Sequence, residues 1–214
     1  MAQPEGTRPV KVGVLLDRRP GDLGEWLADG TAFEAAGADA LWVDPAAEPE
    51  LPLDPFALTA ALAAVTARSL LVATLPVPGG PSPALARTLA TIGRLSRGRL
   101  RVLADAVPAA AAAEAVPGLG VFRRIPGHPE SFVHTPEPAA HAEQAAGPDA
   151  GPDEPERWVS VPSPDSRAAW RATLLDASEH GTAGLLVPAG PRLLDILRNP
   201  DDPGHRRDLQ LAQG

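Results

Sequence analysis

Cysteine and tyrosine are absent from this chain of 214 residues, and Lys11 is its only lysine. Without cysteine the chain has no disulfide framework, no thiolate zinc site and no cysteine nucleophile. It also lacks any run of about 18 apolar residues, which a bilayer-spanning helix needs. The segment Met1–Pro9 is largely polar. We therefore expect no secretory leader, no membrane partner and a cytoplasmic location.

Clustered positive charge is missing as well. The chain has 19 Lys and Arg residues against 27 Asp and Glu residues, a formal net charge of −8, and its arginines form no stripe. Binding to a phosphate backbone needs a concentrated basic surface. We therefore expect no nucleic-acid partner.

What the sequence does contain is a regular alternation of apolar runs and helical patterns in its first half. The runs begin about thirty residues apart and are apolar on both faces, which is typical of strands buried in a parallel sheet. The predicted strands are Val10–Leu16, Ala40–Val43, Leu70–Leu75 and Leu100–Leu103. Helices with capping residues at Asp22, Asp54 and Ser82 are expected between them.

After Asp105 this rhythm stops. Residues 106–156 are predicted to form an irregular insertion rich in proline and glycine, which includes a mobile linker at 138–155. Within the insertion, Val121–Ile125 and Ser131–His134 have the composition of a β-hairpin.

Regular structure is expected again from Arg157. The pattern predicts a strand at 157–161, a helix that opens at Ser163, a strand at 183–187 and a helix at Pro191–Arg198. Residues 199–214 are expected to form a polar tail, and the whole chain to form one domain.

Such βα units allow either a (β/α) barrel or an open doubly wound sheet. Three segments favour the barrel: Ala38–Asp44 (ADALWVD), Asp54–Arg68 (DPFALTAALAAVTAR) and Ser82–Leu100, which opens with SPALAR and ends with LSRGRL. They resemble motifs of the bacterial luciferase-like family of flavin- and deazaflavin-dependent oxidoreductases. The resemblance implies an α/β fold, a degenerate, shortened TIM-like (β/α) barrel.

The resemblance also implies a function. Members of the family bind FMN or a deazaflavin, and the chain is expected to be an oxidoreductase of the monooxygenase type that acts on a small molecule. Asp44-Pro45 stands where the family usually places a histidine, and Ala104–Val107 replaces a glycine-rich turn. Typical members are also considerably longer. A non-catalytic flavin-binding or subunit-like barrel, and an open-sheet binding module, therefore remain alternatives.

Ligands of parallel barrels bind at the carboxyl ends of the strands. This rule selects Asp44, Thr74 and Asp105, and the resemblance places the Thr74 region beside the flavin ring. Gly190 and Arg192 lie between a late strand and a helix, where backbone amides and a counter-charge suit a phosphate. These five residues are the predicted cofactor site.

The histidines show no metal-ligand spacing, and we expect no metal site. His128, His134 and His141 lie in a proline-rich stretch and are expected on exposed loops. No GxSxG motif follows a strand, so a serine hydrolase is not indicated. The sequence names no catalytic residue.

A shortened barrel lacks some of the helices that would cover its strands. The apolar strand faces would then be exposed to water, which is rare for large apolar patches on soluble monomers. Luciferase-like barrels commonly pair through their early helices. We therefore expect a homodimer, or a heterodimer with a full-length homologue. The helices expected to form this contact are those that carry Trp26, Phe33, Phe56 and Leu62.

Overall fold

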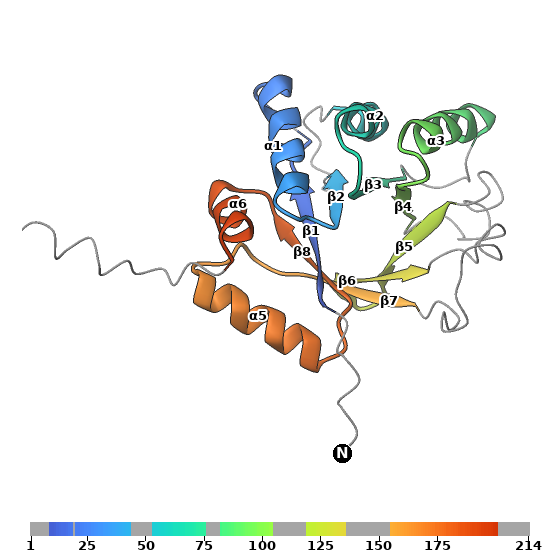
Figure 1. Cartoon of the computed structure of the whole chain (residues 1–214). Helices are drawn as coiled ribbons and strands as arrows, with labels where there is room; N and C mark the ends of the chain where they lie inside the picture. Colours follow the sequence, from blue (N-terminus) through green and yellow to red (C-terminus); the bar gives the residue numbers. More distant parts are fainter. Residues whose placement is uncertain are drawn as a thin grey trace, which may run out of the picture.

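Eight strands form a closed barrel in the computed structural model, which describes residues 9–18, 20–43, 53–75, 82–104, 119–135 and 155–200 (Figure 1). The strands are β1 (Lys11–Leu16), β2 (Ala40–Val43), β3 (Leu70–Thr74), β4 (Leu100–Leu103), β5 (Gly120–Ile125), β6 (His128–Thr135), β7 (Glu156–Ser160) and β8 (Gly184–Pro188). The helices are α1 (Leu23–Ala35), α2 (Pro55–Val65), α3 (Pro83–Leu95), α5 (Arg167–Glu179) and α6 (Pro191–Arg198). The predicted α/β barrel is thereby confirmed.

The strand order follows the chain order, and β8 closes the barrel against β1. Neighbouring strands are parallel except at β6, which runs antiparallel to both β5 and β7. In an open doubly wound sheet, β1 would lie between β2 and β3. Here β2 pairs with β1 and with β3, so the open sheet is excluded.

The predicted hairpin is part of the barrel wall. β5 and β6 pair through the turn at Pro126-Gly127, where Gly127 has a φ of 78°. Helices α1, α2 and α3 lie outside one side of the barrel and α5 and α6 outside another, while no described helix lies outside this hairpin (Figure 1). Most of the predicted linker at 138–155 and of the tail at 199–214 falls outside the described residues.

The start of α5 differs from the prediction at Ser163. The helix begins at Arg167, because Ser166 is its N-cap and accepts a hydrogen bond from the Ala169 amide at 3.1 Å. Ser163 Oγ lies instead 3.5 Å from the carbonyl oxygen of Pro188. The three residues before the cap remain non-helical and carry the chain from β7 to α5.

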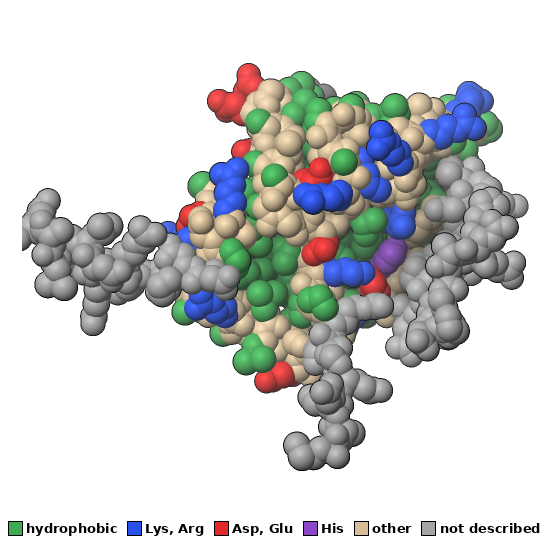
Figure 2. All heavy atoms as spheres, in the orientation of Figure 1, with side chains coloured by type: hydrophobic (Ala, Val, Ile, Leu, Met, Phe, Trp, Pro, Cys, Tyr) green, Lys and Arg blue, Asp and Glu red, His purple; other side chains and the backbone are tan. Residues whose placement is uncertain are grey.

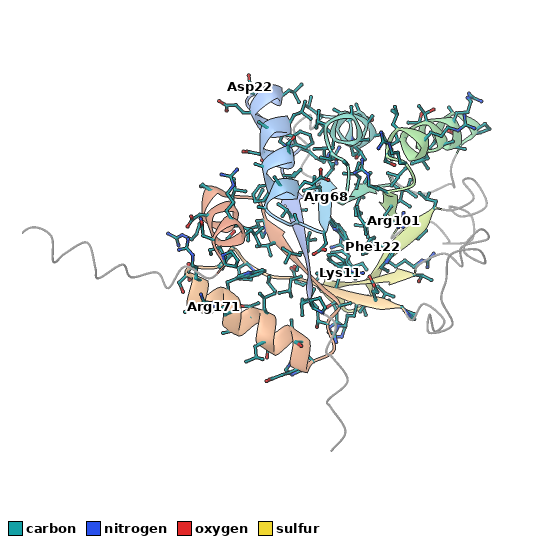
Figure 3. All side chains as sticks on the ribbon, viewed as in Figure 1. Lys11, Asp22, Arg68, Arg101, Phe122 and Arg171 are labelled. Atoms are coloured by element: carbon teal, nitrogen blue, oxygen red, sulfur yellow. The ribbon has the colours of Figure 1, made fainter. Side chains whose placement is uncertain are left out.

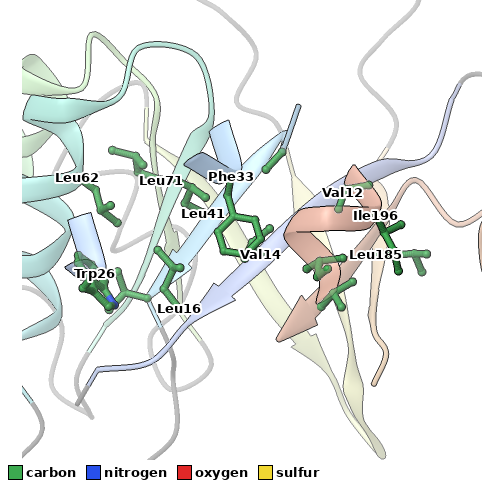
Figure 4. Packing of buried hydrophobic residues seen from close by; sticks show 14 of the residues in the cluster. Val12, Val14, Leu16, Trp26, Phe33, Leu41, Leu62, Leu71, Leu185 and Ile196 are labelled. Atoms are coloured by element: carbon green, nitrogen blue, oxygen red, sulfur yellow. The ribbon is translucent and has the colours of Figure 1, made fainter. Parts of the chain in front are cut away.

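The outer core lies between the helices and the barrel wall (Figure 4). Val12, Val14 and Leu16 of β1 point outward into it, as the period of two in a strand requires. Leu62 of α2 and Ile196 of α6 pack into the same cluster. No described helix is long and apolar enough to cross a membrane.

The four large side chains of the early helices belong to the protomer's own interior. Trp26 is 6% exposed, and its indole N–H donates to the carbonyl oxygen of Asp17 at 2.8 Å. Phe33, Phe56 and Leu62 are buried as well. A contact between protomers through α1 and α2 stays a prediction, and it would have to use other residues of these helices.

The inside of the barrel is filled by aromatic rings. The ring of Trp42 lies 4.6 Å from that of Phe122, 5.2 Å from that of Phe132 and 6.3 Å from that of Trp158. We call these four residues the aromatic plug. All four are at most 3% exposed. The middle of the barrel is thus a packed core, as in TIM barrels generally.

Candidate functional site

The carboxyl ends of the parallel strands carry the residues that the sequence selected. Thr74 is the last residue of β3 and is half-buried. Gly190 and Arg192 follow β8 at the same end of the barrel. Asp44 and Asp105 lie outside the described residues, directly after the segments that contain β2 and β4.

Gly190 is the N-cap residue of α6, and no side chain caps that helix. Pro191, at the first helical position, removes one amide donor. Arg192 donates from Nη1 to the carbonyl oxygen of Asp165 at 3.2 Å and lies 3.8 Å from the Asp165 carboxylate. Its side chain is 64% exposed, so the guanidinium stays open to solvent and to a ligand.

A hollow of about 410 Å³ lies beside the turn of the β5–β6 hairpin, and the sequence did not predict it. Its lining residues are Ala104, Arg123, Arg124, Ile125, Pro126 and Val133. The guanidinium carbon of Arg124 lies 5.3 Å from the centre of the Phe132 ring, and its Nη1 donates to the carbonyl oxygen of Pro129. Arginine side chains next to apolar ones can pair with the anionic group of an aromatic ligand and stack on its ring.

Another hollow, of about 420 Å³, lies near the amino ends of β2 and β3. Its polar side chains hold the fold together. Asp39 accepts a hydrogen bond from the Val12 amide, and Glu34 accepts from the amides of Ala67, Arg68 and Ser69. Because both carboxylates are used by backbone donors, we assign this hollow a structural role.

A cluster of charged side chains lies inside the amino end of the barrel, opposite the predicted site. It consists of Lys11 on β1, Arg101 on β4, His134 on β6 and Glu156 on β7, and we call it the amino-end cluster. Lys11 Nζ lies 2.5 Å from Glu156 Oε1, and His134 Nδ1 lies 3.6 Å from Glu156 Oε2. The His134 ring stacks on Phe122, with 4.5 Å between their centres. The cluster thus borders the aromatic plug.

The expectation that His134 is exposed is wrong, since the residue is 5% exposed. It pairs with Phe122 and Glu156 across two strand ladders, so its side chain faces inward with theirs. The alternation of Phe132, Val133 and His134 carries this information, but only once the segment is assigned to a closed barrel.

Burial lowers the pKa of His134, and the nearby charge of Arg101 lowers it further, while Glu156 opposes both effects. Burial alone would raise the pKa of Glu156. The hydrogen bond from Lys11 and its charge outweigh that effect, so the pKa of Glu156 is lowered. At neutral pH the cluster therefore holds a neutral imidazole beside an ionised carboxylate.

This arrangement predicts that acid destabilises the protein. Below the ordinary pKa of 6.5 the unfolded chain binds a proton at His134 that the folded protein does not bind. The free energy of unfolding should therefore fall from pH 7.5 to pH 5.5, by at most about 1.4 kcal/mol per pH unit for this one group. Urea unfolding at both pH values measures it.

The matched variants are His134→Gln and His180→Gln. The first should flatten the pH dependence. The second removes a histidine whose side chain is 68% exposed and is the control. An unchanged slope in His134→Gln would contradict the assignment.

No family model matches the chain, and no curated protein is similar to it. Similar solved structures include the EDTA monooxygenase EmoA from Chelativorans sp. BNC1, 20% identical over 50% of this chain and 32% of that one, with a TM-score of 0.39. Tryptophan synthase from M. tuberculosis is 17% identical over 91% and 92%, with a TM-score of 0.45. A type II Baeyer-Villiger monooxygenase from Pseudomonas putida, in complex with FMN, is 17% identical over 89% and 62%, with a TM-score of 0.39.

The chain thus spans only about a third of the length of EmoA. At these levels of similarity, the barrel assignment rests on the strand pairing of the chain itself. The chemistry has to be argued from its residues.

Proposed function

We propose that the chain is a shortened, divergent luciferase-like barrel that binds FMN or a deazaflavin at the carboxyl ends of its strands. One observation carries the proposal. The segments that resemble the family fall on β2, α2 and the α3–β4 junction, which are successive units of one closed barrel. Thr74 ends β3, and in the sequence Asp44 comes directly after β2 and Asp105 shortly after β4, so the rule on carboxyl ends applies to three adjacent strands.

The residues of this end suit such a cofactor. The Thr74 hydroxyl is a hydrogen-bond donor and acceptor for the polar edge of a flavin ring. The exposed guanidinium of Arg192, beside the Gly190 cap of α6, suits a phosphate. When bound, the cofactor supplies hydride and oxygen chemistry, and the protein's part is to bind, orient and shield it. The proposed activity is oxidation of a small molecule, of the monooxygenase type.

Cofactor binding is tested by titrating the purified protein with FMN and, separately, with the deazaflavin F420. Quenching of cofactor fluorescence should saturate for at least one of the two. Arg192→Gln should weaken binding roughly tenfold, as expected for one lost charge-assisted contact to a phosphate. Thr74→Val should weaken it less, because a hydrogen bond between neutral groups contributes less.

The matched control is Arg171→Gln. Arg171 is an exposed arginine of α5 whose Nη2 donates to the carbonyl oxygen of Pro200 (Figure 3). This variant should bind like the wild type. Equal loss in Arg192→Gln and Arg171→Gln would indicate a general charge effect, and no saturation with either cofactor would overturn the proposal.

The second candidate is a non-catalytic barrel that binds flavin or serves as a subunit. It is favoured by two departures from the motifs of the family: Asp44-Pro45 stands where a histidine is usual, and Ala104–Val107 replaces the glycine-rich turn. A protein that binds cofactor, but does not reoxidise it faster than free solution when reduced and exposed to oxygen, would support this candidate.

We further propose a cytoplasmic location and assembly with a second barrel, as a homodimer or as a heterodimer with a full-length homologue. The support is the hairpin side of the barrel, outside which no described helix lies. Light scattering of the isolated chain, alone and mixed with a homologue, tests this. A monomer mass of 22.1 kDa in both samples would contradict it.

A further inference from the structure

Helix α2 carries no charged side chain, although one of its faces is exposed. Its sequence is PFALTAALAAV, in which Thr59 is the only polar residue and is buried. The exposed positions are Ala57, Ala64 and Val65. The outer face of a surface helix normally carries charged or polar side chains, and a helix that is apolar on all sides is normally covered. The outer face of α2 therefore has the composition of a covered surface.

The two helices that pack beside α2 carry charges of opposite sign. α1 has the exposed carboxylates Glu25 and Asp29 and no basic residue. α3 has the exposed arginines Arg87 and Arg94 and no acidic residue. None of these four side chains forms an ion pair with a described residue. Figure 1 shows α1, α2 and α3 side by side, and Figure 2 shows acidic side chains over α1 and basic ones over α3.

The arginines of α3 belong to a basic segment of an acidic protein. The formal net charge of the chain is −8, yet its sequence has six arginines and no Asp or Glu between Asp54 and Asp105. Arg99 is used inside the protomer, because its guanidinium donates to backbone carbonyl oxygens. Arg87 and Arg94 instead face solvent, where a surface that carries carboxylates would complement them. The outer face of α1 is such a surface on every copy of the chain, which points to self-association.

The symmetry of a pair follows from the direction of the helices. α1, α2 and α3 each connect one parallel strand to the next, so all three run from the carboxyl end of the barrel to its amino end. A two-fold axis parallel to the helices places α1 of one copy opposite α3 of the other, with α2 opposite α2. A two-fold axis perpendicular to them within the interface would place α1 opposite α1, so that like charges meet. The charges therefore favour the parallel axis, around which both copies make the same contacts.

The positions of the charges along the helices agree with this pairing. α1 and α3 each have 13 residues. Glu25 and Asp29 are the third and seventh residues of α1, and Arg87 is the fifth residue of α3. Where the two helices start level, Arg87 lies between the two carboxylates, about 3 Å along the axis from each at a rise of about 1.5 Å per residue. Arginine and glutamate side chains are long enough to span such an offset.

We propose that the outer faces of α1, α2 and α3 bind a second copy of this chain around a two-fold axis parallel to the helices. α2 packs on α2 at the centre, and Glu25 and Asp29 of each copy pair with Arg87 and Arg94 of the other at the rim. An apolar centre with a charged rim is usual in protein interfaces, where the rim charges mainly determine which partner binds. The proposal rests on the homodimer put forward above and deepens it, because it names the contact surface on the early helices and not on the hairpin.

Two charge-reversed proteins test the pairing in the full chain. Glu25→Arg with Asp29→Arg makes α1 basic, and Arg87→Glu with Arg94→Glu makes α3 acidic. Each protein on its own then brings like charges together at both contacts. Each should raise the dimer dissociation constant about 100-fold or more relative to the wild type, as measured by sedimentation equilibrium.

An equimolar mixture of the two charge-reversed proteins should recover the dimer. The basic α1 of the first then meets the acidic α3 of the second, and the basic α3 of the first meets the acidic α1 of the second. Recovery also shows that both proteins are folded, because a misfolded chain could not restore the contact. If both proteins stay near the monomer mass of 22.1 kDa alone and also when mixed, the assignment is overturned.

Ala64→Glu tests the centre of the surface, because it places two carboxylates opposite each other near the axis. It should weaken the dimer about tenfold or more, and the fold should tolerate it because Ala64 is exposed. The matched controls lie on α5, where Ala172, Arg171 and Glu179 are also exposed. Ala172→Glu, Arg171→Glu and Glu179→Arg should dimerise like the wild type. Equal weakening by Ala64→Glu and Ala172→Glu would indicate a general charge effect and would contradict the proposed surface.

Failure of this surface and failure of the homodimer give different results. A wild-type protein that stays monomeric at every concentration from micromolar to millimolar overturns both. Dimers in both charge-reversed proteins overturn the surface alone and leave another face, such as the hairpin side, for the homodimer. Titration of the same proteins with FMN reports cofactor binding separately, so neither result bears on the flavin proposal.

Discussion

Trp158→Ala is expected to lower the free energy of unfolding by about 3 to 5 kcal/mol, the usual cost of removing a large aromatic ring from a packed core. Trp158 is 0% exposed, and its ring contacts Trp42 and Phe122 of the aromatic plug. Since these rings come from different strands, they cannot close together over the space left behind. Urea unfolding followed by circular dichroism measures the change.

Trp158→Phe should cost less, because a smaller cavity remains. Leu175→Ala is the surface control, since Leu175 is 62% exposed and should change stability by less than about 0.5 kcal/mol. A Trp158→Ala protein as stable as Leu175→Ala would show that the plug is not the core of the barrel.

A substitution at Gly184 tests the packing of the Trp158 ring in a second way. A Cβ at Gly184 would overlap the Trp158 ring, so Gly184→Ala should destabilise the protein by about 1 to 3 kcal/mol through overpacking. Combined with Trp158→Ala, the alanine should cost much less, because the ring that it strikes is gone. If the losses in unfolding free energy of the two single variants simply add in the double variant, Gly184 and Trp158 are not in contact.

The order of strands and helices could be predicted because it rests on local signals. Asp54 and Ser82 cap α2 and α3 as expected, and each is followed by a proline at the first helical position. The apolar runs became β1 to β4 because a sheet covered on both faces needs apolar residues on both. Local patterns of this kind do not depend on what packs against them.

The direction in which a side chain points could not be predicted in the same way. Lys11 and Glu156 are 145 positions apart, and only closure of the barrel brings β1, β7 and β8 together. The pairing of β6 with β5 and β7, which places His134 on the inner face beside Phe122 and Glu156, likewise follows from tertiary structure and not from composition. The burial of Trp26 and Phe33 within the protomer could not be predicted for the same reason, since an apolar helix face does not reveal what covers it.

The same distinction separates the site residues that were predicted from those that were missed. Thr74, Gly190 and Arg192 were found because the rule on carboxyl ends needs only the strand boundaries. The amino-end cluster and the arginines beside the hairpin were missed because they depend on pairs of distant strands. A sequence method would have to detect that Gly120 and Arg101 lie on neighbouring strands in register, as they do here.

Glu34→Ala is expected to destabilise the protein by about 1 to 3 kcal/mol, the cost of leaving the buried Ser69 amide without a partner, while the partly buried amides of Ala67 and Arg68 add less. The Glu34 carboxylate accepts from Ala67 N at 2.8 Å, Arg68 N at 2.7 Å and Ser69 N at 2.8 Å, and so ties the end of α1 to the loop before β3. Glu34→Gln retains one acceptor oxygen and should cost less. Thermal and urea unfolding at pH 7 measure both variants.

The pH dependence of stability shows how much the charge of Glu34 contributes, apart from the size of its side chain. Burial alone would raise the pKa of Glu34, but the amides of Ser69, Arg68 and Ala67 outweigh burial and lower it. Its contribution is therefore complete well above the ordinary pKa of 4.5 and is lost as the pH falls below that value. The stability difference between wild type and Glu34→Gln should accordingly shrink from pH 7 to pH 3. Asp29→Ala, which removes an exposed carboxylate of the same helix, is the control. A pH-independent stability difference for Glu34→Gln would show that the charge of Glu34 does not contribute.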